Sequence, residues 1–323
     1  MSTAKVDLGR RLFYDTRLSG RDRYACASCH HQDRAFTDGL PQAVGSTGAR
    51  HPRSAMSLTN VAYNATFGWA DPSRRSLEAQ MVVPMYNEHP VELGLAGRDA
   101  EVLGRFAEVP ADVERFRRAF PDESNPVTMS NVIRAVASFE RTLISGDSPL
   151  DRFLYRDDRQ ALSASAQRGM TLFFSKKLQC GECHSGFNLS GATAFQDGDP
   201  PDVVFHNTAL YNVDGRGGYP AIDQGLIAVT REPRDMGRFR APSLRNIAVT
   251  APYMHDGSLP TLDAVLSHYS TGGAPSPLAS SRMTGFALSA TDRADLIAFL
   301  ESLTDTTFLT NPDFGPPGTA KGR

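Results

Sequence analysis

The sequence predicts a mostly α-helical protein built from two similar units, with long loops and little β-strand. A Gly-x-x-Leu-Phe-aromatic pattern occurs at residues 9–14 and again at residues 169–174, which indicates a duplicated unit. Each unit later contains a pattern of apolar residues at helical spacing. The stretches in between are rich in Gly, Pro, Asn and Asp. We therefore expect long loops at residues 37–56, 84–99, 186–242 and 270–285.

Each predicted helix has a basis in the local sequence. In both units the Gly-x-x-Leu-Phe-aromatic segment is typical of the end of a helix that leads into a loop. Each unit should close with an amphipathic helix. The apolar faces of these two helices consist of Val132, Ile133, Val136, Phe139 and Leu143, and of Leu296, Ile297, Leu300 and Leu303. Ser289, with Asp292 three residues later, predicts a variant of the capping box at the start of the second helix.

The length of the chain is sufficient for two domains of ordinary size. The segment Gly146-Asp-Ser-Pro149 is the expected boundary region. We predict an N-terminal domain at residues 1–147, a C-terminal domain at residues 148–311 and a disordered tail at residues 312–323.

Charge and hydropathy exclude two classes of partner. The 34 basic and 36 acidic residues give a formal net charge of −2, so the composition does not indicate a polyanion such as nucleic acid. No apolar run approaches the roughly 18 residues that a membrane-spanning helix needs.

The four cysteines are the most informative residues. All four lie in two Cys-x-x-Cys-His motifs, at residues 26–30 and 180–184, so none is left for a disulfide. This motif is typical of covalent c-type haem attachment, because two thiols at this spacing reach the two vinyl groups of one porphyrin and the adjacent imidazole binds the iron. A zinc knuckle or a redox dithiol is the alternative. Two such motifs that use every cysteine favour two covalent haems.

The two predicted haems indicate in which cellular compartment the protein matures. Attachment of this kind requires an oxidising compartment outside the cytoplasm, so we expect a periplasmic protein. Residues 1–10 lack the apolar region of a signal peptide. We therefore expect a mature or engineered chain from which the signal peptide is absent.

A series of further motifs, in this order along the chain, resembles the bacterial dihaem cytochrome c peroxidase/MauG superfamily. These motifs are Leu-Phe-Tyr-Asp-x-Arg-Leu-Ser (12–19), Ser-Leu-x-Asn-Val (57–61), Ser-Leu-Glu-x-Gln (76–80), Pro-Val-Glu-Leu (90–93), Ala-Pro-Ser-Leu-Arg-Asn (241–246) and Ala-Pro-Tyr-Met-His-Asp-Gly (251–257), together with the two haem motifs. The resemblance covers nearly the whole chain. It implies two cytochrome c-like haem domains packed together and a reaction with hydrogen peroxide.

Four stretches are similar to one branch of this superfamily, the MbnH enzymes of methanobactin operons. They are residues 44–48, 51–53, 69–72 and 87–97. The resemblance implies a MauG-like enzyme that forms a bis-Fe(IV) state with peroxide. It further implies oxidation of a tryptophan to kynurenine on a partner, a periplasmic copper-binding protein of the MbnP kind. A peroxidase that takes electrons from a small redox protein and a non-enzymatic dihaem electron carrier are the alternatives.

The first haem, with His30 as its proximal ligand, is the expected peroxide site. Cleavage of the O–O bond requires a group that moves a proton between the two oxygens. The resemblance implies that Gln80, Pro84 and Glu92 lie over this haem. Glu92 stands two residues further along than in the commoner family pattern, so Glu88 and His89 remain alternatives for the acid–base group.

The second haem, with His184 as its proximal ligand, is the expected electron reservoir. The resemblance implies that Tyr269 is its distal ligand, where peroxidases of the superfamily have Met and MauG-like enzymes have Tyr. A phenolate stabilises high-valent iron, whereas a thioether raises the haem potential. His268 is a rival ligand, and Met254 and Met283 are weaker ones. Tyr269 could also be an ordinary buried aromatic residue.

Trp69, the only tryptophan, matches a family residue between the haems that relays an oxidising equivalent. The usual reading of a lone tryptophan is simple core packing.

The resemblance also implies a Ca²⁺ ion bound by the backbone carbonyls of Thr250 and Pro252, although the family's Asn ligand is Ser54 here. Arg245 and Arg53 are predicted partners of haem propionates, with generic surface salt bridges as the alternative.

Three other histidines have weaker assignments. His255 matches a family residue near the second haem, where we expect a structural role. His51 and His206 belong to no motif that supports iron binding.

Overall fold

The computed structural model describes residues 1–194 and 202–318 of the chain. Most of its regular structure is helical. The longer helices are α1 (Thr3–Phe13), α2 (Leu77–Tyr86), α3 (Asp99–Ala107), α4 (Pro110–Ala119), α5 (Met129–Glu140), α7 (Ala164–Phe173), α9 (Leu262–Thr271) and α10 (Ala290–Glu301). The shorter ones are α6 (Pro149–Tyr155), α8 (Ile227–Thr230) and α11 (Thr306–Thr310). The predicted mostly α-helical class is confirmed.

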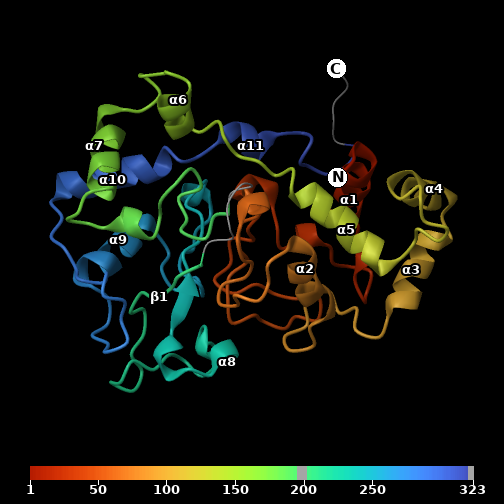
Figure 1. Cartoon of the computed structure of the whole chain (residues 1–323), viewed down its shortest axis with the longest axis horizontal. Helices are drawn as coiled ribbons and strands as arrows, with labels where there is room; N and C mark the ends of the chain where they lie inside the picture. Colours follow the sequence, from red (N-terminus) through yellow and green to blue (C-terminus); the bar gives the residue numbers. More distant parts are fainter. Residues whose placement is uncertain (195–201, 319–323) are drawn as a thin grey trace.

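The helices form two groups that lie side by side (Figure 1). One group has α1 packed along α5, with α2, α3 and α4 beside them. In the other group α7 packs along α10, with α6 and α9 nearby. The pairs α1–α5 and α7–α10 occupy corresponding places in the two groups, as the duplicated sequence pattern predicts.

A glycine allows the close approach of the helices in each pair. A Cβ atom on Gly9 would lie 1.9 Å from the carbonyl oxygen of Ala135 in α5. A Cβ atom on Gly169 would lie at the same distance from the carbonyl oxygen of Asp295 in α10. The first residue of the repeated pattern is therefore a glycine because each helix touches the backbone of its partner there.

The predicted helix ends are confirmed. Helices α1 and α7 end at Phe13 and Phe173, and each is followed by the loop that leads into a cysteine motif. The Ser289 hydroxyl accepts a hydrogen bond from the Asp292 amide, and the Asp292 carboxylate accepts one from the Ser289 amide, which is the predicted capping box.

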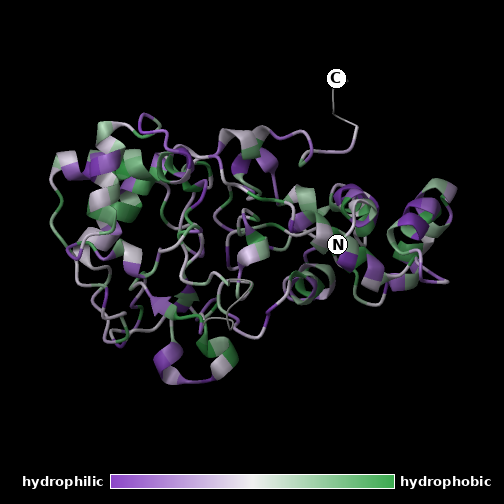
Figure 2. Ribbon diagram, turned by 45° about the horizontal axis from the view of Figure 1, so that its top comes forward, coloured by the Kyte–Doolittle hydropathy of each residue, from purple (hydrophilic) through white to green (hydrophobic). Residues whose placement is uncertain are grey.

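Two apolar cores lie beneath these helices. The helices carry both hydrophobic and hydrophilic residues along the ribbon (Figure 2). The N-terminal core contains Phe13, Phe36 and Phe139, whose rings pack edge to face. The C-terminal core is smaller and is centred on Phe173 and Phe299. Edge-to-face packing of this kind adds to the gain from burial alone.

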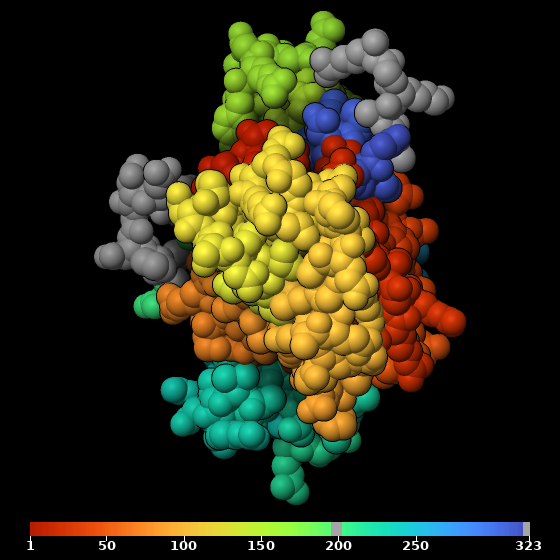
Figure 3. All heavy atoms as spheres, turned by 90° about the vertical axis from the view of Figure 1, so that its right-hand side faces the viewer, coloured from red at the N-terminus to blue at the C-terminus, as the bar shows by residue number. Residues whose placement is uncertain are grey.

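The β structure is limited to one antiparallel pair, among the residues that the structure describes. Strand β1 (Phe205–Asn207) pairs with β2 (Arg238–Arg240), with Phe205 opposite Arg240. The segment between the strands contains α8 and projects from one end of the molecule, below the segment of α3 to α5 that covers the face in Figure 3. The prediction of little strand is confirmed.

The end of the chain differs from the prediction. Phe308, in α11, belongs to the N-terminal core and packs on Phe36. Residues 312–318 lie on α1, where the Tyr14 hydroxyl donates a hydrogen bond to the Phe314 carbonyl and Arg10 donates to the Gly315 carbonyl. Residues 319–323 of the predicted disordered tail lie outside the described residues. For residues 312–318 the prediction was wrong, because α1 offers donors for their backbone carbonyls.

None of the helices in the described ranges is long and apolar enough to cross a membrane.

Candidate functional site

The two Cys-x-x-Cys-His motifs fold alike. Each begins with a single 3-10 turn, Cys26–Ser28 in the first and Cys180–Glu182 in the second. In both, the imidazole Nδ1 binds a backbone carbonyl: His30 that of Phe36 at 2.6 Å, and His184 that of Leu189 at 3.1 Å. A carbonyl partner makes Nδ1 the donor and leaves Nε2 with a lone pair for a metal.

Each motif lines a pocket of its own. The N-terminal pocket is lined by Cys26, Cys29 and His30, and the C-terminal pocket by Cys180, Cys183 and His184. Burial raises the pKa of the Cys29 thiol to about 12 and that of Cys180 to about 11. Both motifs therefore present buried, protonated thiols at the wall of a pocket, each beside an imidazole with a free Nε2.

The N-terminal pocket brings together the predicted catalytic residues. Gln80 and Pro84 line it from α2, and Glu92 lines it from the following loop. The loop is held against the helix because the Leu93 amide donates to the Pro84 carbonyl at 2.9 Å. Neither Glu88 nor His89 is among the residues that line this pocket within the described chain, so the geometry favours Glu92 as the acid–base group.

Burial raises the pKa of the Glu92 carboxyl to about 7. The charge of Arg74 has a smaller, opposite effect on this pKa. His51 Nε2 lies 3.2 Å from Glu92 Oε1, although it is not oriented for a hydrogen bond. Burial, with the nearby Arg53 charge, lowers the pKa of His51. A group with a pKa near 7 can both take and give a proton at neutral pH.

The sequence analysis missed three residues of this pocket. His51 was given no role, yet it faces Glu92. Arg74 donates a hydrogen bond to Gln80 Oε1 at 3.3 Å and so orients that amide. Glu140 lines the pocket from α5 and is 9% exposed, and burial raises its pKa to about 8. Its position in an otherwise apolar helix end was the one signal that could have indicated it.

The C-terminal pocket contains Tyr269 together with His184. Burial raises the pKa of the Tyr269 hydroxyl, with the neighbouring Cys183 and Cys180 as lesser causes. The rival His268 points elsewhere, since its Nε2 lies 2.8 Å from the Thr208 carbonyl and it is not among the lining residues.

Four further possible iron ligands share this pocket. Met254 and Met283 line it, as do His206 from β1 and His255. His255 stacks on Phe239 with ring centroids 3.8 Å apart, which agrees with the structural role expected of it.

Trp69 lies between the pockets. It lines both of them, and its indole N–H donates to the Ser54 carbonyl at 3.2 Å. Trp69 is therefore shared by the two pockets, and its relay role stays a prediction.

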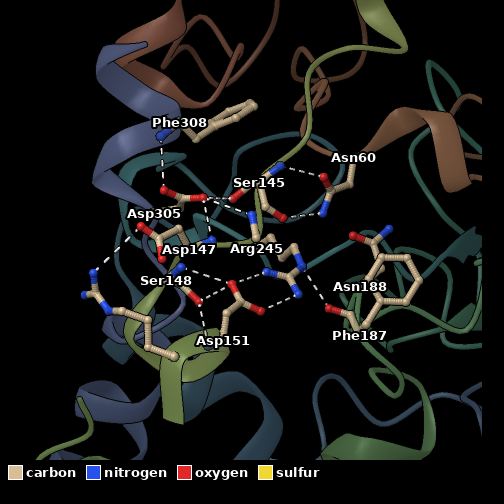
Figure 4. A network of polar contacts seen from close by, with 12 residues as sticks. Asn60, Ser145, Asp147, Ser148, Asp151, Phe187, Asn188, Arg245, Asp305 and Phe308 are labelled. Atoms are coloured by element: carbon tan, nitrogen blue, oxygen red, sulfur yellow. Dashed lines mark hydrogen bonds and ion pairs between the residues drawn. The ribbon is translucent and has the colours of Figure 1, made fainter. Parts of the chain in front are cut away.

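The two arginines predicted to bind haem propionates lie in different surroundings. Arg53 lines the N-terminal pocket while it forms a two-point ion pair with Asp223, at 2.7 Å for both contacts. Arg245 lines neither pocket among the described residues; it forms a two-point ion pair with Asp151 at 2.8 Å and donates to the Phe187 carbonyl (Figure 4). The ion pair with Asp151 occupies the Arg245 guanidinium, so a contact of Arg245 with a propionate stays a prediction that this geometry does not support.

The predicted calcium residues lie close together. Thr250 and Pro252 line the C-terminal pocket, and the Ser54 hydroxyl lies 3.4 Å from the carbonyls of Met254 and His255 just beyond them. Within the described residues no cluster of three or more His, Cys, Asp or Glu side chains suits a metal ion. A site built from backbone carbonyls would not form such a cluster, so calcium stays a prediction.

The residues of both pockets fit a covalent haem. Each pocket offers two thiols, an imidazole with a free Nε2 and a largely apolar wall. Between the pockets lies a buried arginine, Arg240, which has no carboxylate partner in the described part of the chain. Bound there, haem iron would supply the capacity to react with peroxide and to store oxidising equivalents.

Comparisons with known proteins agree with this site. A family model described as di-haem cytochrome c peroxidase matches residues 3–159, and one described as RoxA-like, cytochrome c-like matches residues 238–270. The chain is 37% identical over 307 residues to the methylamine utilization protein MauG of Methylorubrum extorquens, which covers 94% of this chain and 79% of that protein. It is 33% identical over 307 residues to the cytochrome c551 peroxidase of Pseudomonas aeruginosa, with the same coverage.

Among solved structures, one described as a MauG-like protein associated with microbial copper homeostasis superimposes with a TM-score of 0.95 at 43% identity, and covers 98% of this chain and 94% of its own. The two haem motifs, the paired pockets and these similarities lead to one conclusion: the chain belongs to the dihaem cytochrome c peroxidase/MauG family.

Proposed function

We propose that this protein is a MauG-like dihaem enzyme that uses hydrogen peroxide to oxidise a residue of a partner protein. The partner is a periplasmic copper-binding protein of the MbnP kind, and the reaction is the conversion of tryptophan to kynurenine. The proposal draws on the MbnH-like sequence stretches and on the similar structure associated with copper homeostasis.

The observation that carries the proposal is the position of Tyr269. Its side chain lies in the C-terminal pocket with His184, whereas the neighbouring His268 is occupied by the Thr208 carbonyl. An anionic oxygen ligand favours the oxidised forms of iron, and a thioether favours the reduced form. Tyrosine ligation would therefore suit an enzyme that stores oxidising equivalents.

In the N-terminal pocket the protein's own groups would handle protons. Glu92, with a pKa of about 7, can take a proton from peroxide and return it to the departing oxygen. Gln80, oriented by Arg74, supplies an amide that can fix the peroxide by hydrogen bonding. Trp69 spans the wall between the pockets and offers an easily oxidised side chain for exchange between them.

A peroxidase fed with electrons by a small redox protein is the second candidate. It is favoured by Met254 and Met283, whose thioethers share the pocket with Tyr269. A non-enzymatic electron carrier is the third, and the acid–base residues of the N-terminal pocket would then have no use.

One experiment separates these candidates. Stoichiometric hydrogen peroxide is added to the diferric protein while visible and near-infrared spectra are recorded. The proposal predicts a long-lived oxidised species with a near-infrared charge-resonance band. Reaction only after partial reduction would instead indicate the peroxidase, and no reaction the carrier.

A ligand variant tests Tyr269 itself. Tyr269→Met should abolish the near-infrared species while both haems stay attached. The matched control is Tyr253→Phe, which removes a hydroxyl in the same pocket that is bound to the Ile247 carbonyl. An intact near-infrared species in Tyr269→Met would contradict the assignment. Incubation with an MbnP-like protein and peroxide, followed by mass spectrometry of its tryptophan peptides, tests the substrate.

A further inference from the structure

Arg240 is the last residue of β2 and lies between the two pockets. It is 4% exposed and lines both of them. Its backbone amide donates to the Trp69 carbonyl at 2.8 Å, and its Nε donates to the Gly68 carbonyl at 3.1 Å. The first bond holds the backbone and the second holds the guanidinium at Nε, so backbone carbonyls rather than a charged neighbour orient the Nη1 and Nη2 groups.

The guanidinium of Arg240 has no carboxylate partner among the described residues. The other arginines that line the pockets each have one: Arg53 pairs with Asp223, Arg74 with Asp71 and Arg282 with Glu182. The further contact of Arg240 Nη2 is the Met56 sulfur, at 3.7 Å. Burial alone lowers the pKa of Arg240 to about 10, with no charged group acting on it.

The walls of the pockets offer little negative charge to balance the Arg240 guanidinium. The described residues that line the C-terminal pocket include no aspartate or glutamate. In the N-terminal pocket the carboxyls are Glu92 and Glu140, and burial raises the pKa of both to about 7 and about 8. A cation removed from water without an opposite charge is strongly unfavourable. An anion from outside the polypeptide is therefore expected at this position.

We propose that Arg240 binds propionate carboxylates of both haems at once and is the shared anchor of the pair. A guanidinium has five N–H groups in a planar fork, of which one is used on Gly68. The other four are on Nη1 and Nη2, whose contact among the described residues is the Met56 sulfur, a weak acceptor. They suffice for two carboxylates. The inference rests on the presence of two haems and not on the proposed substrate.

A shared cation has a measurable consequence. A positive charge near a haem disfavours the ferric state, which carries one more positive charge than the ferrous state. Loss of that charge also leaves the propionates uncompensated. Replacement of Arg240 should therefore lower the reduction potentials of both haems, whereas a residue bound to one haem would move only one.

The experiment is an anaerobic spectroelectrochemical titration of the dihaem protein without peroxide or partner. Arg240→Met should lower both midpoint potentials, and Arg240→Lys, which keeps the charge but not the fork, should lower both by less. The matched control is Arg238→Met on the same strand, since Arg238 lines neither pocket and pairs with Asp235. A shift of only one potential, no shift, or an equal shift in Arg238→Met would overturn the proposal.

A second measurement needs no variant. In a crystal structure of the dihaem protein, nitrogen atoms of Arg240 should lie within about 3.2 Å of a propionate oxygen of each haem. Propionates bound instead to Arg53, Arg74 or Arg282 would overturn the proposal. Neither measurement involves peroxide or a partner protein. The role of Arg240 can therefore be tested even if the proposed oxidation of a partner protein is not observed.

Discussion

The buried Arg245–Asp151 ion pair allows a sharp prediction, because the sequence suggested a different partner for Arg245, a haem propionate. The side chains are 6% and 4% exposed, and two hydrogen bonds of 2.8 Å join them. Arg245→Met would leave the Asp151 carboxylate buried, with Ser148 as its remaining partner among the described residues. Loss of one member of a buried pair costs about 3–5 kcal/mol. With a urea m-value of about 3 kcal/mol/M, the unfolding midpoint should fall by roughly 1–1.7 M.

The pH dependence follows from the same pair. Burial raises the pKa of Asp151, but the hydrogen bonds and charge of Arg245, together with the hydrogen bonds from Ser148, outweigh it, so that the net pKa is lowered. A carboxyl whose pKa is lower in the folded state stabilises the protein above the unfolded pKa of about 3.9. This stabilisation is lost as the pH falls from about 3.9 through the folded pKa. This pH-dependent contribution to stability should be much smaller in the Arg245→Met variant.

The assay is urea unfolding followed by circular dichroism at neutral pH, with Asp151→Asn as the second arm of a double-mutant cycle. Asp151→Asn keeps an oxygen for Ser148 and should cost much less in the Arg245→Met background than in the native protein. The haem potentials should not change. A decrease in the free energy of unfolding below about 1 kcal/mol would refute the reasoning about the ion pair. A shift of either haem potential would instead support the propionate role of Arg245.

Three other predictions follow from the site and the cores. Gly9→Ala should lower the free energy of unfolding by about 1–3 kcal/mol in denaturant titrations, because its Cβ would lie 1.9 Å from the Ala135 carbonyl oxygen, and unchanged stability would contradict this contact. The rate of the peroxide reaction should rise with pH around 7 as Glu92 ionises, and stopped-flow measurements should find that limb missing in Glu92→Gln; a persistent limb would assign it to another group. Trp69→Phe should slow exchange of oxidising equivalents between the haems in the same measurements, and equal rates would reduce Trp69 to packing.

The residues of the two attachment motifs could be assigned from sequence because their chemistry is local. The spacing of Cys26, Cys29 and His30 lies within one turn of chain, and the same holds for the second motif. Helix ends were predictable for the same reason, since the Ser289 capping box involves residues only three apart. Local geometry needs no knowledge of the rest of the fold.

The other parts of the site depend on contacts between distant segments. His51 faces Glu92 across a loop, and Arg240 reaches Gly68 and Trp69 from a strand some 170 residues away. The choice between Tyr269 and His268 rests on which of them is turned into the pocket, and the structure points His268 at Thr208. A motif cannot reveal such pairings, because burial and charge compensation exist only once the chain is packed.

The sequence by itself determined the mostly helical class, the duplication and two attachment points for haem. The tertiary structure alone decided which charges are satisfied: Arg245 by Asp151, and Arg240 by no carboxylate of the described chain. The physical reason is that a motif specifies bonds over a few residues, whereas the free energy of a buried charge depends on every group that surrounds it.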